Sequence, residues 1–420
     1  MSERIDVEDL LRQLAPQVLG ALLRRYGNWE MCEDALQEAL FEVSDDWERH
    51  GVPEHPRGLL VTVANRRMID QIRRESARRD REARTLVGAP PAELLRLPGA
   101  DEDIDRDDSL ILLFMCCHPA LSAPSQIALT LRSLGGLSTR EIAGAFFVPE
   151  ATMAQRISRA KQRIREVGAS FSIPPADELE MRVSVVHHVL YLIFNEGYTT
   201  SSGPGIHRAD LTAEAIRLTR ELRRLRPFDT ETSGLLALML LTEARRPARV
   251  DAAGDLVPLA EQERTMWDQA LIREGIALVT EALSRGSVGP YQLQAAIAAV
   301  HDEAETADDT DWPQILALYE MLDYVAPNPM ATVNRAVAVG MVQGPLAGLA
   351  LLGTLDGDER VSNHHLFFAV RGHLLEMAGD APGAQRAFTL AARRTASLPE
   401  RRYLEKRAGG RGLRVGSAEE

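Results

Sequence analysis

The 420-residue chain is poor in three features that mark particular classes of protein. It has 3 cysteines, Cys32, Cys116 and Cys117, whose spacing matches neither a metal site nor a disulfide framework. Aromatic residues make up 5% of the chain, and none lies between Trp47 and Phe114. No apolar run approaches the roughly 18 residues of a membrane span, and the first residues lack the apolar core of a secretory signal. We therefore expect a cytoplasmic protein with no disulfide, no metal, no cofactor and no membrane contact.

The charge of the chain is unevenly distributed. The formal net charge is −13, which argues against indiscriminate nucleic-acid binding and leaves only local basic patches for such a role. Residues 65–84 hold eight arginines against four acids, and residues 151–167 hold five basic residues against one acid. Six of the eight residues from 101 to 108 are acidic. Basic and acidic residues therefore predominate in different segments, in a chain long enough for two to three domains.

Residues 136–167 have the pattern of a helix-turn-helix. Ser138 and Glu141 fit a capping box that starts a helix at about Thr139, the helix should end near Phe146, and Pro149 fits the opening of the next helix. The second helix carries an apolar stripe at three- and four-residue steps, made of Met153, Ile157, Ala160, Ile164 and Val167. Its other face carries side chains suited to base edges and phosphates, namely Thr152, Gln155, Arg156, Arg159, Gln162 and Arg163, flanked by Lys161 and Arg165. A merely solvated helix is the weaker interpretation, because cap, turn and basic helix occur in the expected order.

Three further helices are expected before this motif. The first covers residues 7–26, and the second, residues 29–47, buries a stripe made of Leu36, Ala39, Leu40, Val43 and Trp47. The second helix exposes Asp34, Gln37 and Glu38 at i, i+3 and i+4, a patch suited to a basic protein partner, although a solvated face explains it better when the helix is taken alone. A third helix opens at Pro56 and becomes strongly basic in its second half. Residues 85–107 read as an acidic linker rich in proline and glycine.

This order of motifs resembles the extracytoplasmic-function (ECF) subfamily of the sigma-70 factors. The resemblance rests on DALQEA in the second helix, on PRGLLVTVANRRMIDQIRR in the third, on the acidic linker and on the terminal helix-turn-helix. It covers about residues 7–167, and several motifs in the right order make it specific.

The resemblance implies a role for each patch. Asp34, Gln37 and Glu38 match the region that docks on the clamp helices of the largest subunit of core RNA polymerase, and the flap region is the second contact that the resemblance implies. Five residues of the third helix match the region that opens the minus-ten element and captures its single strand: Asn65, Arg66, Asp70, Arg73 and Arg74. An arginine-rich helix followed by the polar SARRDRE segment suits a single-stranded backbone. The residues matched to the minus thirty-five element are Thr152, Gln155, Arg156, Arg159 and Arg163.

The remaining residues, about 250 in number, read as helix after helix, without the alternation of a strand. The last pair fits a tetratricopeptide-type hairpin, with Gly372, Ala384, Phe388 and Ala391 at its small, small, aromatic and small positions. The part from residue 171 resembles the C-terminal tetratricopeptide-like extension of some ECF sigma factors. A stacked-helix solenoid of this kind binds a protein or peptide partner on its concave side.

The sequence thus predicts an all-α chain of two small helical sigma domains joined by the acidic linker and followed by a large solenoid-like domain. The expected boundaries are 1–84 for polymerase docking and minus-ten recognition, 85–107 for the linker, 108–170 for minus thirty-five recognition and 171–420 for the extension. The histidines show no paired i, i+4 spacing, and no nucleophile constellation stands out, so no catalytic residue is assigned and the chain is not expected to be an enzyme. The alternative function is a helix-turn-helix regulator with a helical sensor, which binds duplex DNA without polymerase.

Overall fold

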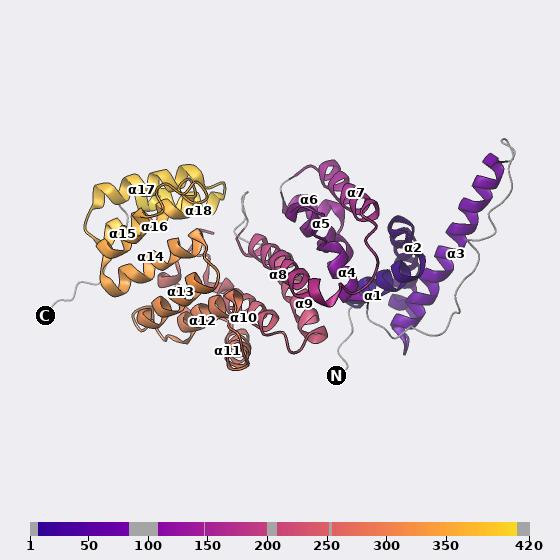
Figure 1. Ribbon diagram of the computed structural model, residues 1–420, viewed down its shortest axis with the longest axis horizontal. Coiled ribbons are helices and arrows are strands. Elements are labelled where there is room, and N and C mark those ends of the chain that lie inside the picture. Colours follow the sequence, from indigo (N-terminus) through magenta and orange to yellow (C-terminus); the bar gives the residue numbers. More distant parts are fainter. Residues whose placement is uncertain (1–6, 84–107, 147, 200–207, 252–253, 410–420) are drawn as a thin grey trace. The chain divides into compact units, whose positions relative to one another are not determined.

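The computed structural model shows a chain built from helices (Figure 1). It describes residues 7–83, 108–146, 148–199, 208–251 and 254–409, so the predicted linker at 85–107 lies outside the described residues. Within that description no strand occurs, and the extended pairing consists of a single antiparallel bridge between Val250 and Leu256. The predicted all-α class is confirmed. Contacts divide the chain into two compact units, residues 1–189 and residues 190–420.

Three long helices begin the first unit: α1 (Val7–Tyr26), α2 (Trp29–His50) and α3 (Pro56–Ala83). Helix α2 starts where the side chain of Asn28 accepts a hydrogen bond from the backbone N–H of Met31, and it stops at Gly51, whose φ of 89° favours glycine. The predicted stripe is buried as expected, except that Leu40 is only half-buried. Burial of one side fixes α2 against α1 and α3, which leaves the side with Asp34, Gln37 and Glu38 exposed.

The second half of this unit contains the predicted helix-turn-helix. Helices α4 (Ser109–Cys116) and α5 (Ala123–Ser133) precede α6 (Thr139–Ala145) and α7 (Glu150–Glu166). Both hydrogen bonds of the capping box are present, at 3.2 Å from Glu141 N to Ser138 Oγ and at 2.7 Å from Ser138 N to Glu141 Oε2. Pro149 is the residue before α7 rather than its first residue. The predicted stripe is wrong at Val167, which follows the helix and is 38% exposed.

Helix α4 has no solvent-facing side. Each of its residues except Leu110 is buried, because apolar residues occupy the helix all the way round. At its start, Asp108 is fully buried and lies 3.0 Å from Arg24 of α1. Near its end, the carbonyl of Phe114 accepts a 2.7 Å hydrogen bond from the buried Arg182 of α8 (Ala176–Tyr198). The contacts of the first unit therefore continue past residue 170, the predicted end of the second sigma domain, to Val189.

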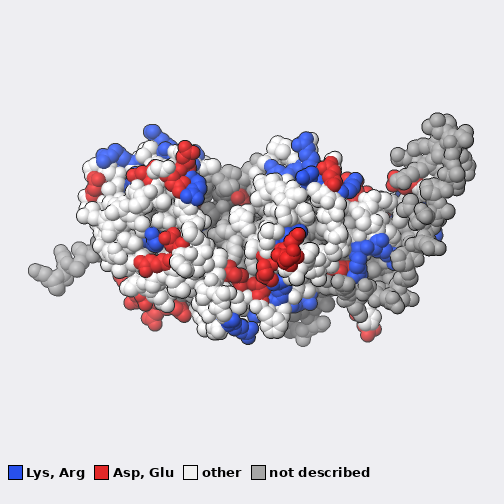
Figure 2. Space-filling view, viewed as in Figure 1, with Lys and Arg blue, Asp and Glu red and all other residues white. Residues whose placement is uncertain are grey.

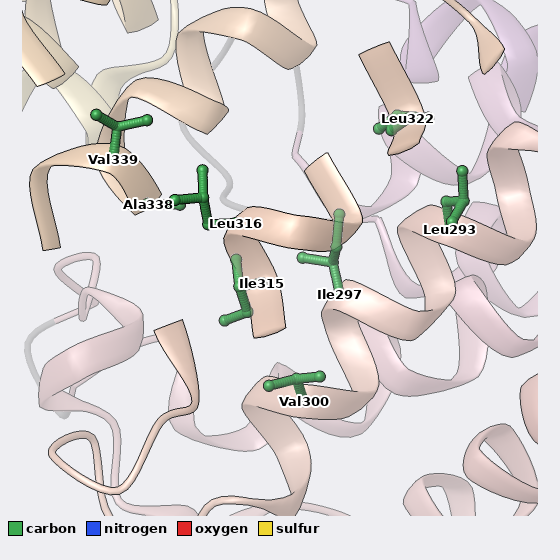
Figure 3. Packing of buried hydrophobic residues seen from close by; sticks show 8 residues of the cluster. All are labelled: Leu293, Ile297, Val300, Ile315, Leu316, Leu322, Ala338 and Val339. Carbon is green, nitrogen blue, oxygen red and sulfur yellow. The ribbon is translucent and has the colours of Figure 1, made fainter. Parts of the chain in front are cut away.

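The second unit is a stack of helices that begins within α8. The helices that follow are α9 (Ala209–Leu225), α10 (Thr230–Ala244), α11 (Gln269–Ser284), α12 (Pro290–Glu303), α13 (Trp312–Val325), α14 (Pro329–Gln343), α15 (Pro345–Gly353), α16 (His365–Met377), α17 (Ala381–Arg394) and α18 (Leu398–Ala408). From α9 on, each helix packs on its sequence neighbours, and α10 also packs on α12. Figure 3 shows one core of this stack, where leucine, isoleucine and valine side chains of α12, α13 and α14 meet.

Helices α16 and α17, the predicted hairpin, pack closely at one glycine. Gly372 of α16 faces Phe388 of α17, and a Cβ added at Gly372 would lie 2.8 Å from the Phe388 ring. Ala384, Phe388 and Ala391 are buried in the same contact. The four residues therefore meet as a close-packed hairpin, while its tetratricopeptide character stays a prediction.

A buried ionic cluster joins α10 and α12. The guanidinium of Arg245 lies 2.6 Å from the buried carboxylate of Asp302, and Arg264 stacks 4.7 Å from the ring centroid of Trp267. Burial, together with the charges of Arg245 and Arg264, lowers the pKa of His301 to about 3. Burial raises the pKa of Asp302 to about 6. Both groups thus change the pH dependence of stability.

We expect Gly372→Ala to destabilise the chain by about 1 to 3 kcal/mol, because the new methyl group overpacks against Phe388. The matched control is Gly353→Ala in α15, where nothing lies within 4 Å of an added Cβ. That control should be neutral or slightly stabilising, since alanine favours a helix over glycine. Urea-denaturation midpoints measure both effects, and equal midpoints for the two variants would contradict the packing.

We expect His301 to make the chain less stable as the pH falls from about 7 to about 5. The unfolded chain binds a proton at His301 below its ordinary pKa of about 6.5, whereas the folded chain keeps the ring neutral down to a pKa of about 3. Asp302 has the opposite effect, because its raised pKa in the folded chain makes the fold more stable as the pH falls. Comparing His301→Gln with the wild type isolates the contribution of the histidine. The stability difference between them should shrink by about 1 to 2 kcal/mol over that range.

The measurement is the urea-denaturation midpoint of both proteins at the two pH values. His188→Gln, which removes an exposed imidazole from α8, tests whether the effect depends on burial. A wild-type to His301→Gln difference that does not change with pH would show that this ring is not held neutral.

Candidate polymerase and nucleic-acid interface

The acidic patch predicted on α2 is exposed. Asp34, Gln37 and Glu38 all face solvent, on the side of the helix opposite Val43 and Trp47. Glu38 also lies 3.7 Å from Arg67 and 3.9 Å from Arg74 of α3. The patch is therefore accessible to a partner, and its Glu38 also lies close to the basic helix α3.

A stronger connection between α2 and α3 runs through Glu42. Its two carboxylate oxygens accept hydrogen bonds from Arg66 at 2.7 Å and from Arg67 at 3.0 and 2.5 Å. The hydrogen bond from Arg67, followed by the smaller effect of Arg66, lowers the pKa of the Glu42 carboxyl. Neither Glu42 nor Arg67 was predicted as a site residue. Only the packing of the two helices brings them together, so no local sequence pattern could have found the pair.

The residues predicted for the minus-ten element lie on α3, but not all on one side. At about 100° per residue, Arg66, Asp70, Arg73 and Arg74 share an arc of about 100°, and Asn65 lies about 80° outside it. Arg66, Arg73 and Arg74 are exposed, whereas Asp70 and Asn65 are half-buried. Asn65 Oδ1 is buried and has no hydrogen-bond partner among the described residues. Within the SARRDRE segment, only the side chain of Ser76 belongs to the described part.

Helix α7 presents the face predicted to read the minus thirty-five element. Thr152, Gln155, Arg159 and Arg163 are exposed, and Arg156 is half-buried. The opposite side is buried, with Met153, Ile157, Ala160 and Ile164 at most 5% exposed. Because the stripe fixes the rotation of α7, the polar face points away from the domain core. The geometry thus fits insertion of this helix into a major groove.

Two of the basic residues that flank this face are engaged within the chain. Lys161 forms an ion pair with Glu33 of α2, and the two side chains are only 10% and 14% exposed. Glu33 also accepts a 3.1 Å hydrogen bond from Trp29 Nε1. Arg165 lies 3.6 Å from Glu30, one turn of α2 away. The helix predicted to read DNA is thus bound to the first turn of α2, 128 residues away in sequence, which sequence reasoning did not anticipate.

Charges of both signs are interspersed on the surface. On the face drawn in Figure 2, basic and acidic side chains alternate and neither sign forms a continuous field. The absence of a continuous basic field on this face is in keeping with the net charge of −13.

The cysteines are free and buried, and burial raises the pKa of Cys32 and of Cys117 to about 12, so both remain thiols. Among the described residues, no three histidine, cysteine, aspartate or glutamate side chains are grouped as metal ligands. A search of the same residues finds no helix with the length and apolar character to cross a membrane.

Comparison with known protein families identifies three segments. Residues 10–78 match sigma-70 region 2, and residues 111–164 match sigma-70 region 4. Residues 182–283 match the family of unknown function DUF6596. The two sigma matches cover the helices that carry the acidic patch, the basic helix and the helix-turn-helix.

Two curated relatives extend the comparison. The chain is 43% identical over 401 residues to an uncharacterized protein, R00370, of Rhizobium meliloti, which covers 93% of this chain and 92% of that protein. It is 27% identical over 168 residues to the ECF RNA polymerase sigma factor SigE of Mycolicibacterium smegmatis, which covers 39% of this chain and 62% of that protein. No solved structure matches. The chain therefore belongs to the same family as the Rhizobium meliloti protein, and its first part carries sigma-70 region 2 and region 4 domains.

Proposed function

We propose that the chain is an ECF-type sigma factor that binds core RNA polymerase, recognises minus thirty-five and minus-ten promoter elements and initiates transcription. The observation that carries the proposal is the pair of exposed faces on one compact unit, an acidic face on α2 and a polar, basic face on α7. A regulator that works without polymerase would have no use for the first of these faces. In the proposed division, residues 1–84 dock and read the minus-ten element, 85–107 link, and 108–170 read the minus thirty-five element.

The helical part from residue 171 is proposed to regulate the sigma domains from the same chain. A covalently attached domain acts at a high effective concentration, so control within the chain needs no separate inhibitor. Stacked helices commonly bind proteins or peptides, and such a partner would be the signal that this part receives.

The proposal predicts that the purified chain directs transcription only when core RNA polymerase is present, and that Asp34→Asn with Glu38→Gln weakens that partnership. Removing two carboxylates from the docking face should reduce affinity for core polymerase about 5- to 30-fold, since each contributes about 1 kcal/mol or less to such an interface. Titration of labelled chain with core polymerase measures the affinity, and run-off transcription from a library of upstream regions measures initiation.

A charge-matched control is Asp46→Asn with Glu54→Gln, which removes two exposed acids outside the patch. It should bind polymerase as the wild type does. Absence of initiation at every promoter in the library would overturn the sigma-factor proposal. Equal affinity of the two double variants for core polymerase would show that the α2 patch is an ordinary solvated surface.

A second prediction concerns base reading by α7. Arg159→Ala should cost about 1 to 3 kcal/mol at one position of the minus thirty-five element, because a bidentate contact with a base edge is lost. Arg159→Lys keeps the charge but cannot make a bidentate contact, so it should lose the same base preference at that position. Promoter selection from a library randomised at the upstream element measures both. If the lysine variant keeps full preference, Arg159 contacts a phosphate instead of a base.

A further inference from the structure

Among the described residues of the first unit, Phe41 has the most exposed large apolar side chain. It lies on α2 and is 86% exposed, whereas Val43 and Trp47 of the same helix are at most 3% exposed. Single exposed apolar residues are common on protein surfaces and need no function. The position of this one within α2 is what distinguishes it.

The ring of Phe41 stands in the middle of the acidic face. At about 100° per residue, it lies about 20° from Asp34, about 40° from Gln37 and about 60° from Glu38 around the helix axis. Asp45, one turn further along, is exposed on the same side. An aromatic side chain surrounded by polar and charged groups is the usual composition of an interface centre, where the surrounding groups exclude water from the buried anchor.

The helix holds this face rigidly. Val43 and Trp47 fix one side of α2 in the core, and Glu42, next to Phe41, is held by two arginines of α3. Little conformational freedom would therefore be lost on binding, which favours affinity.

We propose that Phe41 is the apolar anchor of the polymerase-docking face and inserts into an apolar recess on a basic surface of core RNA polymerase. This inference rests on the proposed function, and it assigns the largest share of docking affinity to a residue outside the predicted acidic patch. The carboxylates around Phe41 require positive charge on the partner, and the exposed ring requires an apolar pocket in the middle of that charge.

Charge complementarity selects this occupant over two others. A second copy of the chain, docked through the same face about a two-fold axis, would bring the acidic faces of the two copies, including Asp34 and Glu38, close together, and like charges repel. DNA carries negative phosphates and is repelled by the same carboxylates. A cationic protein surface satisfies both the ring and its surroundings.

The test compares Phe41→Ala with Phe228→Ala, which truncates an 88% exposed phenylalanine outside α2. Affinity of the full chain for core polymerase should fall about 30-fold or more for Phe41→Ala, as for a central interface aromatic. It should not change for Phe228→Ala. Phe41→Leu, which keeps an apolar side chain, should retain most of the affinity. Thermal midpoints should match the wild type, because Phe41 is not part of the core.

Salt dependence separates the anchor from the charges around it. The loss for Phe41→Ala should be the same at low and high salt, whereas the loss for Asp34→Asn with Glu38→Gln should shrink as salt screens the charges. A loss for Phe41→Ala that shrinks in the same way would contradict an apolar anchor.

The remaining outcomes are distinguishable. If Phe41→Ala binds like the wild type while the Asp34 and Glu38 variant is weakened, the anchor is wrong and the proposed function stands. If the wild-type chain itself does not bind core polymerase, the proposed function fails. If Phe228→Ala loses as much as Phe41→Ala, general surface hydrophobicity explains the effect and the anchor is overturned. Sedimentation showing a dimer that Phe41→Ala dissolves would identify a second copy as the occupant and would also overturn it.

Discussion

The burial of α4 on all sides is the constraint on which the first unit depends. A helix with no polar face is stable in water only if other elements surround it. Here α1 supplies Arg24 for the buried Asp108 at its start, α5 covers it through the Cys116 and Cys117 contacts, and α8 supplies Arg182 near its end. Elements from three separate parts of the sequence thus meet around the eight residues of α4.

The helices predicted for binding all use the same physical device. Burial of one side fixes the rotation of the helix, and the opposite side is then presented at a set angle. In α2 the buried Trp47 and the exposed Phe41 and Asp34 illustrate this, and in α7 the buried Ile157 and the exposed Arg159 do the same. Only the buried side of each helix contributes to the core. Substitutions on the exposed side of α2 or α7 should therefore alter binding with little effect on folding.

Sequence periodicity and capping signals predicted the helices and most of their buried residues correctly, because both signals depend only on neighbouring residues. The capping box of Ser138 and the stripe of α7 needed only neighbouring residues, and the errors at Pro149 and Val167 are one-residue shifts at helix ends, where local signals are weakest. The Glu42 fork and the Lys161 to Glu33 ion pair were missed, because each joins residues that only tertiary packing brings together. Phe41 was passed over since one apolar residue outside a stripe gives no periodic signal.

The ion pair between Lys161 and Glu33 limits how far apart α7 and α2 can lie. Promoter elements named for positions minus ten and minus thirty-five lie roughly 25 base pairs apart, or about 80 Å along a duplex at about 34 Å per turn. While this pair is closed, α7 is in contact with α2. Under the proposed function, the two promoter-contacting helices then reach only a short stretch of DNA. For a chain with the proposed function, simultaneous contact with both elements therefore requires this ion pair to open.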